Sequence, residues 1–350
     1  MGRRATDTSG WRWLALVVYA SGAGAGTIED GSYGSSLVGA VVQYQVYLPA
    51  DYYREAAAGK RYPVVYLLHC AGCRAWDWGD DSYGAMVDNL IDRVECIAVA
   101  PDDGNTLRWW LDSPVEPSSN WSTLLVDELK PRIDSLYNTC PGRANTGIAG
   151  HSMGGFGALH NLIEHPEVFG AAFSMKGTVD LMPYAGNWGL NAVLGEQRKH
   201  RGNWKAVNVV DHVCELAGKD VSIGFYSGPN DWFYEDNRKL HRVLDSCGIA
   251  HRWIRNDEPH FRIPPESMLA VLSFFDSVFV SCSPASTIRL RGAAPPADLV
   301  PAQPPHRRPR YCVLDVKGRR VRFPRDPALG VGVLIAYSPE CRKRMVVEPE

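Results

Sequence analysis

A serine between glycines, in the stretch Gly150-His151-Ser152-Met153-Gly154, has the form G-x-S-x-G. In this motif the serine lies on a tight turn between a strand and a helix, and its neighbours must be small because the turn strains the backbone. The context fits, since an apolar segment precedes the motif and a run of small residues follows it. The pattern predicts that Ser152 is a nucleophile for acyl transfer.

A serine hydroxyl attacks a carbonyl only when a base takes its proton and a carboxylate orients that base. With this motif the base is a histidine late in the chain. His260 follows a predicted strand and lies in a loop, where such a base belongs. The other downstream histidines fit less well, because His160 and His241 fall in predicted helices and His251 begins a strand.

The orienting carboxylate should lie between the serine and the histidine in the sequence. Asp231 directly follows a predicted strand and a Gly-Pro-Asn turn, and it is the best candidate by position. Glu235 and Asp236 are close rivals, but they fall at the start of the next helix, where acidic residues favour the helix itself. Two backbone N–H groups must also stabilise the oxyanion, one from Met153 and one from the loop 67–73.

These residues need a scaffold of strands that end near one another. The segment 38–50 alternates and predicts an edge strand that ends at Pro49, whereas VVYLL at 64–68 is a continuous apolar run typical of a strand buried on both faces. Further strands are predicted within 94–104, before Ser152, and within 221–231 and 251–260, with helices between them. The alternation indicates an open α/β sheet that is mostly parallel.

Composition excludes several functions. The chain of 350 residues has a formal net charge of −2, which argues against nucleic-acid binding. Its nine cysteines show no paired spacing typical of zinc, and no phosphate-binding glycine loop is present, so no metal and no cofactor is expected. Cys70 and Cys73 alone have C-x-x-C form. They leave three interpretations open: a disulfide, a reactive thiol at Cys70, or two small buried residues.

The two ends differ from the centre. Residues 1–26 resemble a secretory signal peptide, with arginines before a short apolar run that is too short to span a membrane. Residues 281–310 form a linker rich in proline and arginine, and 311–350 alternate as in a small β-rich module. The catalytic domain is therefore predicted at 27–280, in a protein that is secreted or held at the cell surface.

Residues 27–280 resemble the esterase D and tributyrin-esterase group of α/β-hydrolases, which includes feruloyl esterases, S-formylglutathione hydrolases and mycolyltransferases. The resemblance rests on RYPVVYLLH, APDDG, GHSMGGFGALHNLIEHPEVF and SGPNDWFYEDNRKLH, in that order. It implies a Ser152, Asp231, His260 triad and a second oxyanion donor at Ala71. Two positions depart from the family: Cys70 stands where glycine is usual, and Phe261 follows His260 where aspartate is common.

The C-terminal segment resembles the sorting domains of type IX secretion and flagellar-hook-type immunoglobulin modules, through VLDVKGRRV and GVGVLIAYSPECRKRMVV. That resemblance implies contact with secretion machinery or attachment to the cell surface.

The expected activity is hydrolysis of carboxylic esters, with feruloyl or acetyl esters of polysaccharides or short-chain esters as substrates. Tryptophans in loops after strands could stack on a sugar or an aromatic acyl group. With His151 they form the predicted substrate-binding set: Trp76, Trp78, Trp109 and Trp110. An acyltransferase with the same triad, a thioesterase of the S-formylglutathione hydrolase type, and a binding protein without catalysis remain alternatives.

Overall fold

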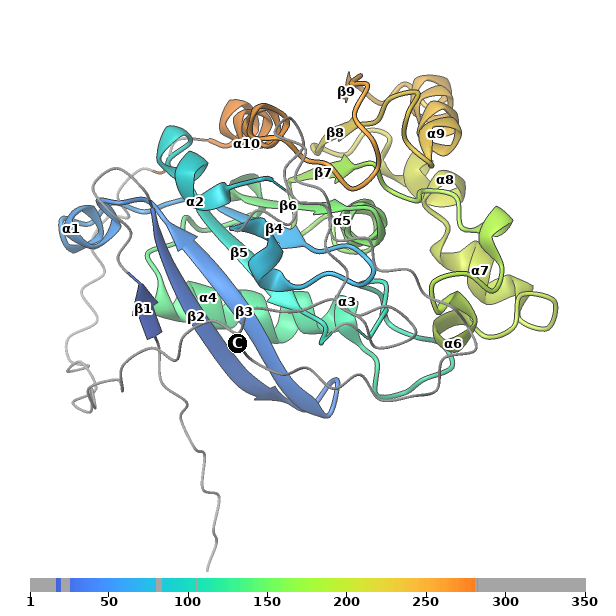
Figure 1. Cartoon of the computed structure of the whole chain (residues 1–350), viewed down its shortest axis with the longest axis horizontal. Coiled ribbons are helices and arrows are strands. Elements are labelled where there is room, and N and C mark those ends of the chain that lie inside the picture. Colours follow the sequence, from blue (N-terminus) through green and yellow to red (C-terminus); the bar gives the residue numbers. More distant parts are fainter. Residues whose placement is uncertain (1–16, 20–25, 80–83, 105, 281, 283–350) are drawn as a thin grey trace, which may run out of the picture. The chain divides into compact units, whose positions relative to one another are not determined.

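The computed structural model describes residues 17–19, 26–79, 84–104, 106–280 and 282. The predicted β module and nearly all of the predicted leader and linker lie outside the described residues. The described part contains one nine-stranded sheet (Figure 1). Its strands are β1 Val17–Tyr19, β2 Thr27–Ser35, β3 Ala40–Leu48, β4 Val64–Leu68, β5 Ile97–Asp102, β6 Thr146–His151, β7 Ala171–Met175, β8 Ser222–Tyr226 and β9 His251–Ile254.

The connections between these strands are mostly helical. The α-helices are α1 Tyr52–Ala57, α2 Val87–Leu90, α3 Trp121–Thr123, α4 Lys130–Leu136, α5 Met153–Glu164, α6 Leu190–Leu194, α7 Arg201–Val207, α8 Val209–His212, α9 Tyr234–Ser246 and α10 Pro265–Val278. A π-helical segment, η3 Leu124–Leu129, joins α3 to α4. Short 3₁₀ helices are η1 Ala75–Trp78, η2 Ile91–Arg93, η4 Arg143–Asn145, η5 Met182–Tyr184 and η6 Val213–Leu216. Among the described residues, no helix is both long enough and apolar enough to cross a membrane.

The strand order is β1-β2-β3-β5-β4-β6-β7-β8-β9. From β5 through β9 neighbouring strands are parallel, whereas β1, β2 and β3 are antiparallel and β3 joins β5 antiparallel. The mostly parallel sheet is therefore confirmed. The prediction that 38–50 forms an edge strand is wrong, because β2 pairs with the whole of β3. β2 contains Asp30, Gly31 and Gly34, which hide its strand pattern in the sequence.

Helices cover both faces of the sheet. Along β4, Val64, Tyr66 and Leu68 face a core that includes side chains of α4, α5 and α9, while Val65 and Leu67 face a second core with α2 and α10. Figure 1 shows α2 and α10 together on one side of the strands. This double burial explains the continuous apolar run of β4 and confirms the interpretation drawn from it.

Three disulfides join described cysteines: Cys70–Cys73, Cys140–Cys282 and Cys214–Cys247. Of the three interpretations left open for the C-x-x-C pair, the structure shows the disulfide. Cys96 is buried and free. Two of these disulfides connect distant parts of the chain. Cys282, after α10, is bonded to Cys140, and Cys247, directly after α9, is bonded to Cys214 in η6.

Candidate active site

The turn at Ser152 joins β6 to α5 with a strained backbone. Ser152 has φ 56° and ψ −112°, outside the common regions for a residue with a side chain. Gly150 and Gly154 are required because a side chain would not fit there, and not because their φ angles are positive. A Cβ on Gly150 would collide with the backbone of Gly154, and a Cβ on Gly154 would collide with the carbonyl oxygen of Leu68. The sequence thus builds a turn that raises the serine at the carboxyl end of β6.

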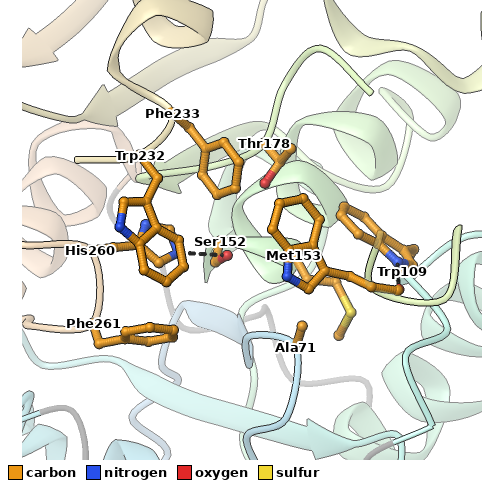
Figure 2. Close-up of a pocket in the computed structure, with 10 residues that line it drawn as sticks. Ala71, Trp109, Ser152, Met153, Thr178, Trp232, Phe233, His260 and Phe261 are labelled. Carbon is orange, nitrogen blue, oxygen red and sulfur yellow. Dashed lines mark hydrogen bonds between the residues drawn. The ribbon is translucent and has the colours of Figure 1, made fainter. Parts of the chain in front are cut away.

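Three side chains meet at this turn, those of Ser152, His260 and Asp231. Figure 2 shows the contact between Ser152 and His260. The Oγ of Ser152 lies 2.9 Å from Nε2 of His260, and Nδ1 of His260 lies 2.7 Å from Oδ2 of Asp231. The other carboxylate oxygen of Asp231 accepts the backbone N–H of Phe233 at 2.8 Å. All three side chains are buried. The structure therefore brings together the serine, carboxylate and histidine that the sequence singled out.

The two rival carboxylates have other partners. Glu235 is exposed and pairs with Arg238 at 2.9 Å. Asp236 accepts a hydrogen bond from the hydroxyl of Tyr184 at 2.9 Å, and its partial burial raises its pKa to about 6. Asp231, in contrast, is within hydrogen-bonding distance of His260.

The loop after β4 forms one wall of the site. Ala71 and Met153, the two predicted oxyanion donors, both line the cavity at Ser152 (Figure 2). The disulfide between Cys70 and Cys73 closes the loop around Ala71, and the N–H of Cys73 donates to the carbonyl of Cys70 at 3.1 Å. The Cys70 side chain is buried in the core on the α2 and α10 face. The extra Cβ at this position therefore packs away from the acyl site.

A buried ion pair between His69 and Asp103 stabilises the same loop. Nε2 of His69 lies 3.3 Å from Oδ1 of Asp103, and the ring also contacts the carbonyl of Cys70 through Nδ1 at 2.9 Å. Burial favours the neutral imidazole, but the charge of Asp103 outweighs it, so the pKa of His69 is raised. The indole N–H of Trp110 donates to the carbonyl of His69 at 3.1 Å. The loop is thus held by groups that do not face the cavity.

His151, which the sequence placed among the substrate-binding residues, lies behind His260. Its Nε2 donates to the backbone carbonyl of His260 at 2.7 Å, and its ring is fully buried. Burial, together with the nearby His260 and Lys176, holds the pKa of His151 well below its usual range. A neutral His151 fixes the backbone of His260 without placing a second positive charge beside it.

Sequence reasoning missed Lys176, which directly follows β7. Its ammonium is fully buried and donates to the carbonyls of Pro259 and Arg262, each at 2.7 Å. Glu258 lies 3.7 Å away. Lys176 therefore links the backbone before His260 to the backbone after it and stabilises this loop. A lysine directly after the mostly apolar run 171–175, and before Gly177, was the signal available in the sequence.

The buried ammonium predicts a pH-dependent stability. Desolvation lowers the pKa of Lys176 from its ordinary 10.5 to about 8, although Glu258 opposes the shift. Between these values the unfolded chain binds a proton that the folded protein has released, so stability gains with rising pH. Relative to Lys176→Met, the wild type should gain as much as about 3 kcal/mol over this window. Urea unfolding from pH 7.5 to 10.5 measures the difference. Lys199→Met, which removes an exposed lysine, is the control and should show no such trend.

Aromatic side chains line most of the cavity, which has a volume of about 320 Å³ including its open mouth. Its lining comprises Ala71, Trp109, Ser152, Met153, Thr178, Trp188, Trp232, Phe233, His260 and Phe261. Trp232 stacks on the ring of His260 at 4.6 Å between centroids and meets Phe261 edge-on at 4.9 Å. The indole N–H of Trp109 donates to the carbonyl of Trp188 at 2.9 Å.

Of the four tryptophans singled out in the sequence, only Trp109 lines this cavity. Trp78 is packed in the core beside α2 and α10, and Trp110 packs edge-on against His69 and Trp121. Trp76 is 40% exposed and lies against the guanidinium of Arg74. The missed aromatics Trp232, Phe233 and Phe261 directly follow Asp231 and His260 in the sequence, and this adjacency was the signal that could have found them.

The chain is similar to known esterases. Residues 35–254 match the Esterase family model, described as "Putative esterase". An esterase of Mycobacterium tuberculosis is 28% identical over 232 residues, covering 59% of this chain and 49% of the relative. A xylanase/feruloyl esterase of Xylanibacter ruminicola is 32% identical over 151 residues, covering 41% of this chain and 21% of the relative. The chain thus spans about half or less of the length of these curated relatives.

Solved structures agree on the fold. A ferulic acid esterase superposes with a TM-score of 0.60 at 23% identity, covering 73% of this chain and 99% of that one. With the mostly parallel sheet flanked by helices, this likeness identifies an α/β-hydrolase fold. Because the family model matches more than half of the chain, the protein belongs to the esterase family.

Proposed function

We propose that the protein is a serine carboxylester hydrolase that works through an acyl-enzyme. The observation that supports this most strongly is the continuous hydrogen-bonded chain from Ser152 through His260 to Asp231 at the wall of a cavity. Membership of the esterase family supports the same reaction class. The chain of contacts supplies the base and the orienting carboxylate that a serine nucleophile needs.

In the proposed first half-reaction, Oγ of Ser152 attacks the ester carbonyl while Nε2 of His260 takes the hydroxyl proton. Asp231 accepts the Nδ1–H of His260, which fixes the tautomer and stabilises the imidazolium. The N–H groups of Met153 and Ala71 stabilise the oxyanion of the tetrahedral intermediate. His260 then gives its proton to the alcohol oxygen, the ester C–O bond breaks, and the acyl group stays on Ser152.

In the second half-reaction water replaces the alcohol. His260 takes a proton from water, and the resulting hydroxide attacks the acyl carbon. Collapse of the intermediate frees the carboxylic acid and returns the proton to Ser152. The ring of Trp232 stacks on one face of the His260 imidazole, and this packing helps to hold the base in position for both proton transfers.

The aromatic cavity supports esters with a flat or short acyl group, such as feruloyl or acetyl esters of polysaccharides. A flat ring can stack on Trp109, Trp188 or Phe233, and each such contact contributes about 0.5–1.5 kcal/mol beyond area burial. The Xylanibacter ruminicola relative named a feruloyl esterase supports this substrate class.

Substrate preference gives a direct test. Trp188→Ala should lower kcat/KM for methyl ferulate by about tenfold while changing that for methyl acetate less than threefold, since methyl acetate has no ring to stack on the indole. Trp76→Ala removes a tryptophan outside the cavity and should leave both values unchanged. Equal losses on both substrates in Trp188→Ala would argue against the aromatic acyl site.

Labelling and product analysis separate the alternatives. A fluorophosphonate should add to Ser152 in intact protein, which a binding protein without catalysis would not do. If acyl groups move from the ester to an added sugar rather than to water, the acyltransferase is the correct assignment. If S-formylglutathione is turned over far faster than any oxygen ester, the thioesterase is correct.

Secretion or placement at the cell surface is also proposed. Three disulfides among the described residues support it, because such bonds persist in oxidising compartments and are rare in the cytosol. The resemblance of the sequence of residues 1–26 to a signal peptide, and the alternating sequence pattern of residues 311–350, support the same location. Fractionation of the source cells, with detection of the mature N-terminus by mass spectrometry, tests this proposal.

A further inference from the structure

A second cluster of reactive side chains lies at the outer strand of the sheet. His241 and Asp245 are one turn apart on α9, and His251 begins β9 beside them. One ligand atom from each of these three residues lies within 4.8 Å of the others. The cluster is at the amino end of β9, whereas His260 follows the carboxyl end of the same strand. It is therefore separate from the esterase site.

His251 is prepared to act as a ligand. Its ring is nearly buried, and its Nδ1 donates to the carbonyl of Ile249 at 2.8 Å. This bond places the proton on Nδ1 and leaves the lone pair of Nε2 facing His241. Histidines that bind metals commonly use one ring nitrogen for the ion and donate the other N–H to a backbone carbonyl in this way.

The other ligand atoms converge on that lone pair. Nδ1 of His241 lies 2.8 Å from Nε2 of His251, and Oδ1 of Asp245 lies 4.0 Å from the same nitrogen. Oδ2 of Asp245 lies 3.4 Å from Nε2 of His241, the ring nitrogen that does not face His251, so the Asp245 carboxylate must turn towards Nδ1 of His241 for the three residues to share one ion. Ligands about 2.0–2.1 Å from a tetrahedral ion stand roughly 3.3 Å apart, within the span of these separations. Small rotations of the exposed Asp245 and half-exposed His241 side chains would bring all three to that spacing.

Aromatic side chains fix the imidazole rings. The ring of His251 stacks on Phe225 with centroids 5.7 Å apart, and the ring of His241 lies 4.8 Å from that of Trp253. Such packing reduces the side-chain entropy that metal binding would otherwise cost.

We propose that His241, Asp245 and His251 form a binding site for Zn²⁺, with water in the fourth position. Two imidazoles and one carboxylate suit this borderline ion and not Mg²⁺ or Ca²⁺, which prefer sets of oxygen ligands. The ion joins the last turns of α9 to the start of β9, next to the disulfide that bonds Cys247 to Cys214. Its role is to stabilise this edge of the fold.

Isothermal titration of the full chain, prepared without an affinity tag, with ZnCl₂ at pH 7.5 tests the proposal. The wild type should bind one ion at this site, and zinc at a hundredfold excess over its Kd should raise Tm by about 5–10 °C. His251→Gln should weaken binding at least tenfold and remove the zinc-dependent rise in Tm. MgCl₂ at the same concentration should have no effect on Tm.

His212→Gln is the matched control, because His212 also pairs with a carboxylate, Glu215 at 2.6 Å, but does not belong to a group of three possible metal ligands among the described residues. This variant should bind zinc as the wild type does. Near-ultraviolet circular dichroism of metal-free His251→Gln reports whether the variant is folded. The proposal is overturned if the wild type binds no zinc at 100-fold its own concentration, or if His251→Gln binds zinc as tightly as the wild type. Either result is independent of the esterase proposal, because the proposed catalytic residues do not include His241, Asp245 or His251.

Discussion

Replacing Ser152 with alanine is expected to lower kcat for p-nitrophenyl acetate by about 10⁴–10⁶-fold. The substitution removes the only atom in the proposed chain that forms a bond to substrate, and the cavity and oxyanion donors alone supply little rate. Folding should be little affected, because alanine needs the same strained backbone at φ 56° and no more space. Initial rates with wild type and variant, at matched concentration and with near-ultraviolet circular dichroism as a check on folding, measure the effect.

Ser174→Ala is the control for this result. Ser174 is a buried serine on β7 that does not line the cavity, so its loss should change kcat less than threefold. Ser152→Ala should also lose all labelling by a fluorophosphonate, whereas Ser174→Ala should keep it. A Ser152→Ala variant that retains a tenth of the activity would rule out the nucleophile assigned here.

Replacing Asp231 with asparagine should lower kcat by about 10⁴-fold. The amide can donate to Nδ1 of His260, which would leave the proton on Nε2, the nitrogen that must accept it from Ser152. The loss should be largely in kcat with little change in KM, because Asp231 contacts His260 and not the substrate. Steady-state kinetics on p-nitrophenyl acetate between pH 6 and 9 measure both constants.

Asp236→Asn is the matched comparison on the same segment. Its carboxylate contacts Tyr184, and its loss should cost less than tenfold. If Asp236→Asn were the more damaging change, the orienting role would belong to Asp236, and the loop after β8 would have to rearrange during catalysis.

The fold was predictable where one physical signal dominated. β4 is buried on both faces, so its side chains are all apolar and its position could be recognised from five consecutive residues. β2 gave no such signal, because its polar residues and internal glycines break the alternation, although it forms a hairpin with the strand that follows it in the sequence. The edge assignment of β3 failed for that reason.

The site residues likewise divide into those that the sequence predicts and those that it does not. Ser152, Asp231 and His260 could be proposed because a strained turn and the order of strands leave marks in the sequence. The aromatic wall could not, because any loop tryptophan could face the cavity or pack elsewhere, and only the three-dimensional course of the chain separates Trp109 from Trp78. Lys176 was missed because its partners are backbone carbonyls, which no side-chain pattern reveals.

The close contact between Gly154 and Leu68 bears on how the oxyanion is stabilised. Because no side-chain atom fits between α5 and the end of β4, the helix that follows Ser152 and the loop that contains Ala71 are pressed backbone to backbone. The two proposed oxyanion amides therefore belong to one rigid unit. Dipoles held in this way need no reorientation when the carbonyl oxygen becomes negative, so the reorganisation energy that water would require is largely avoided.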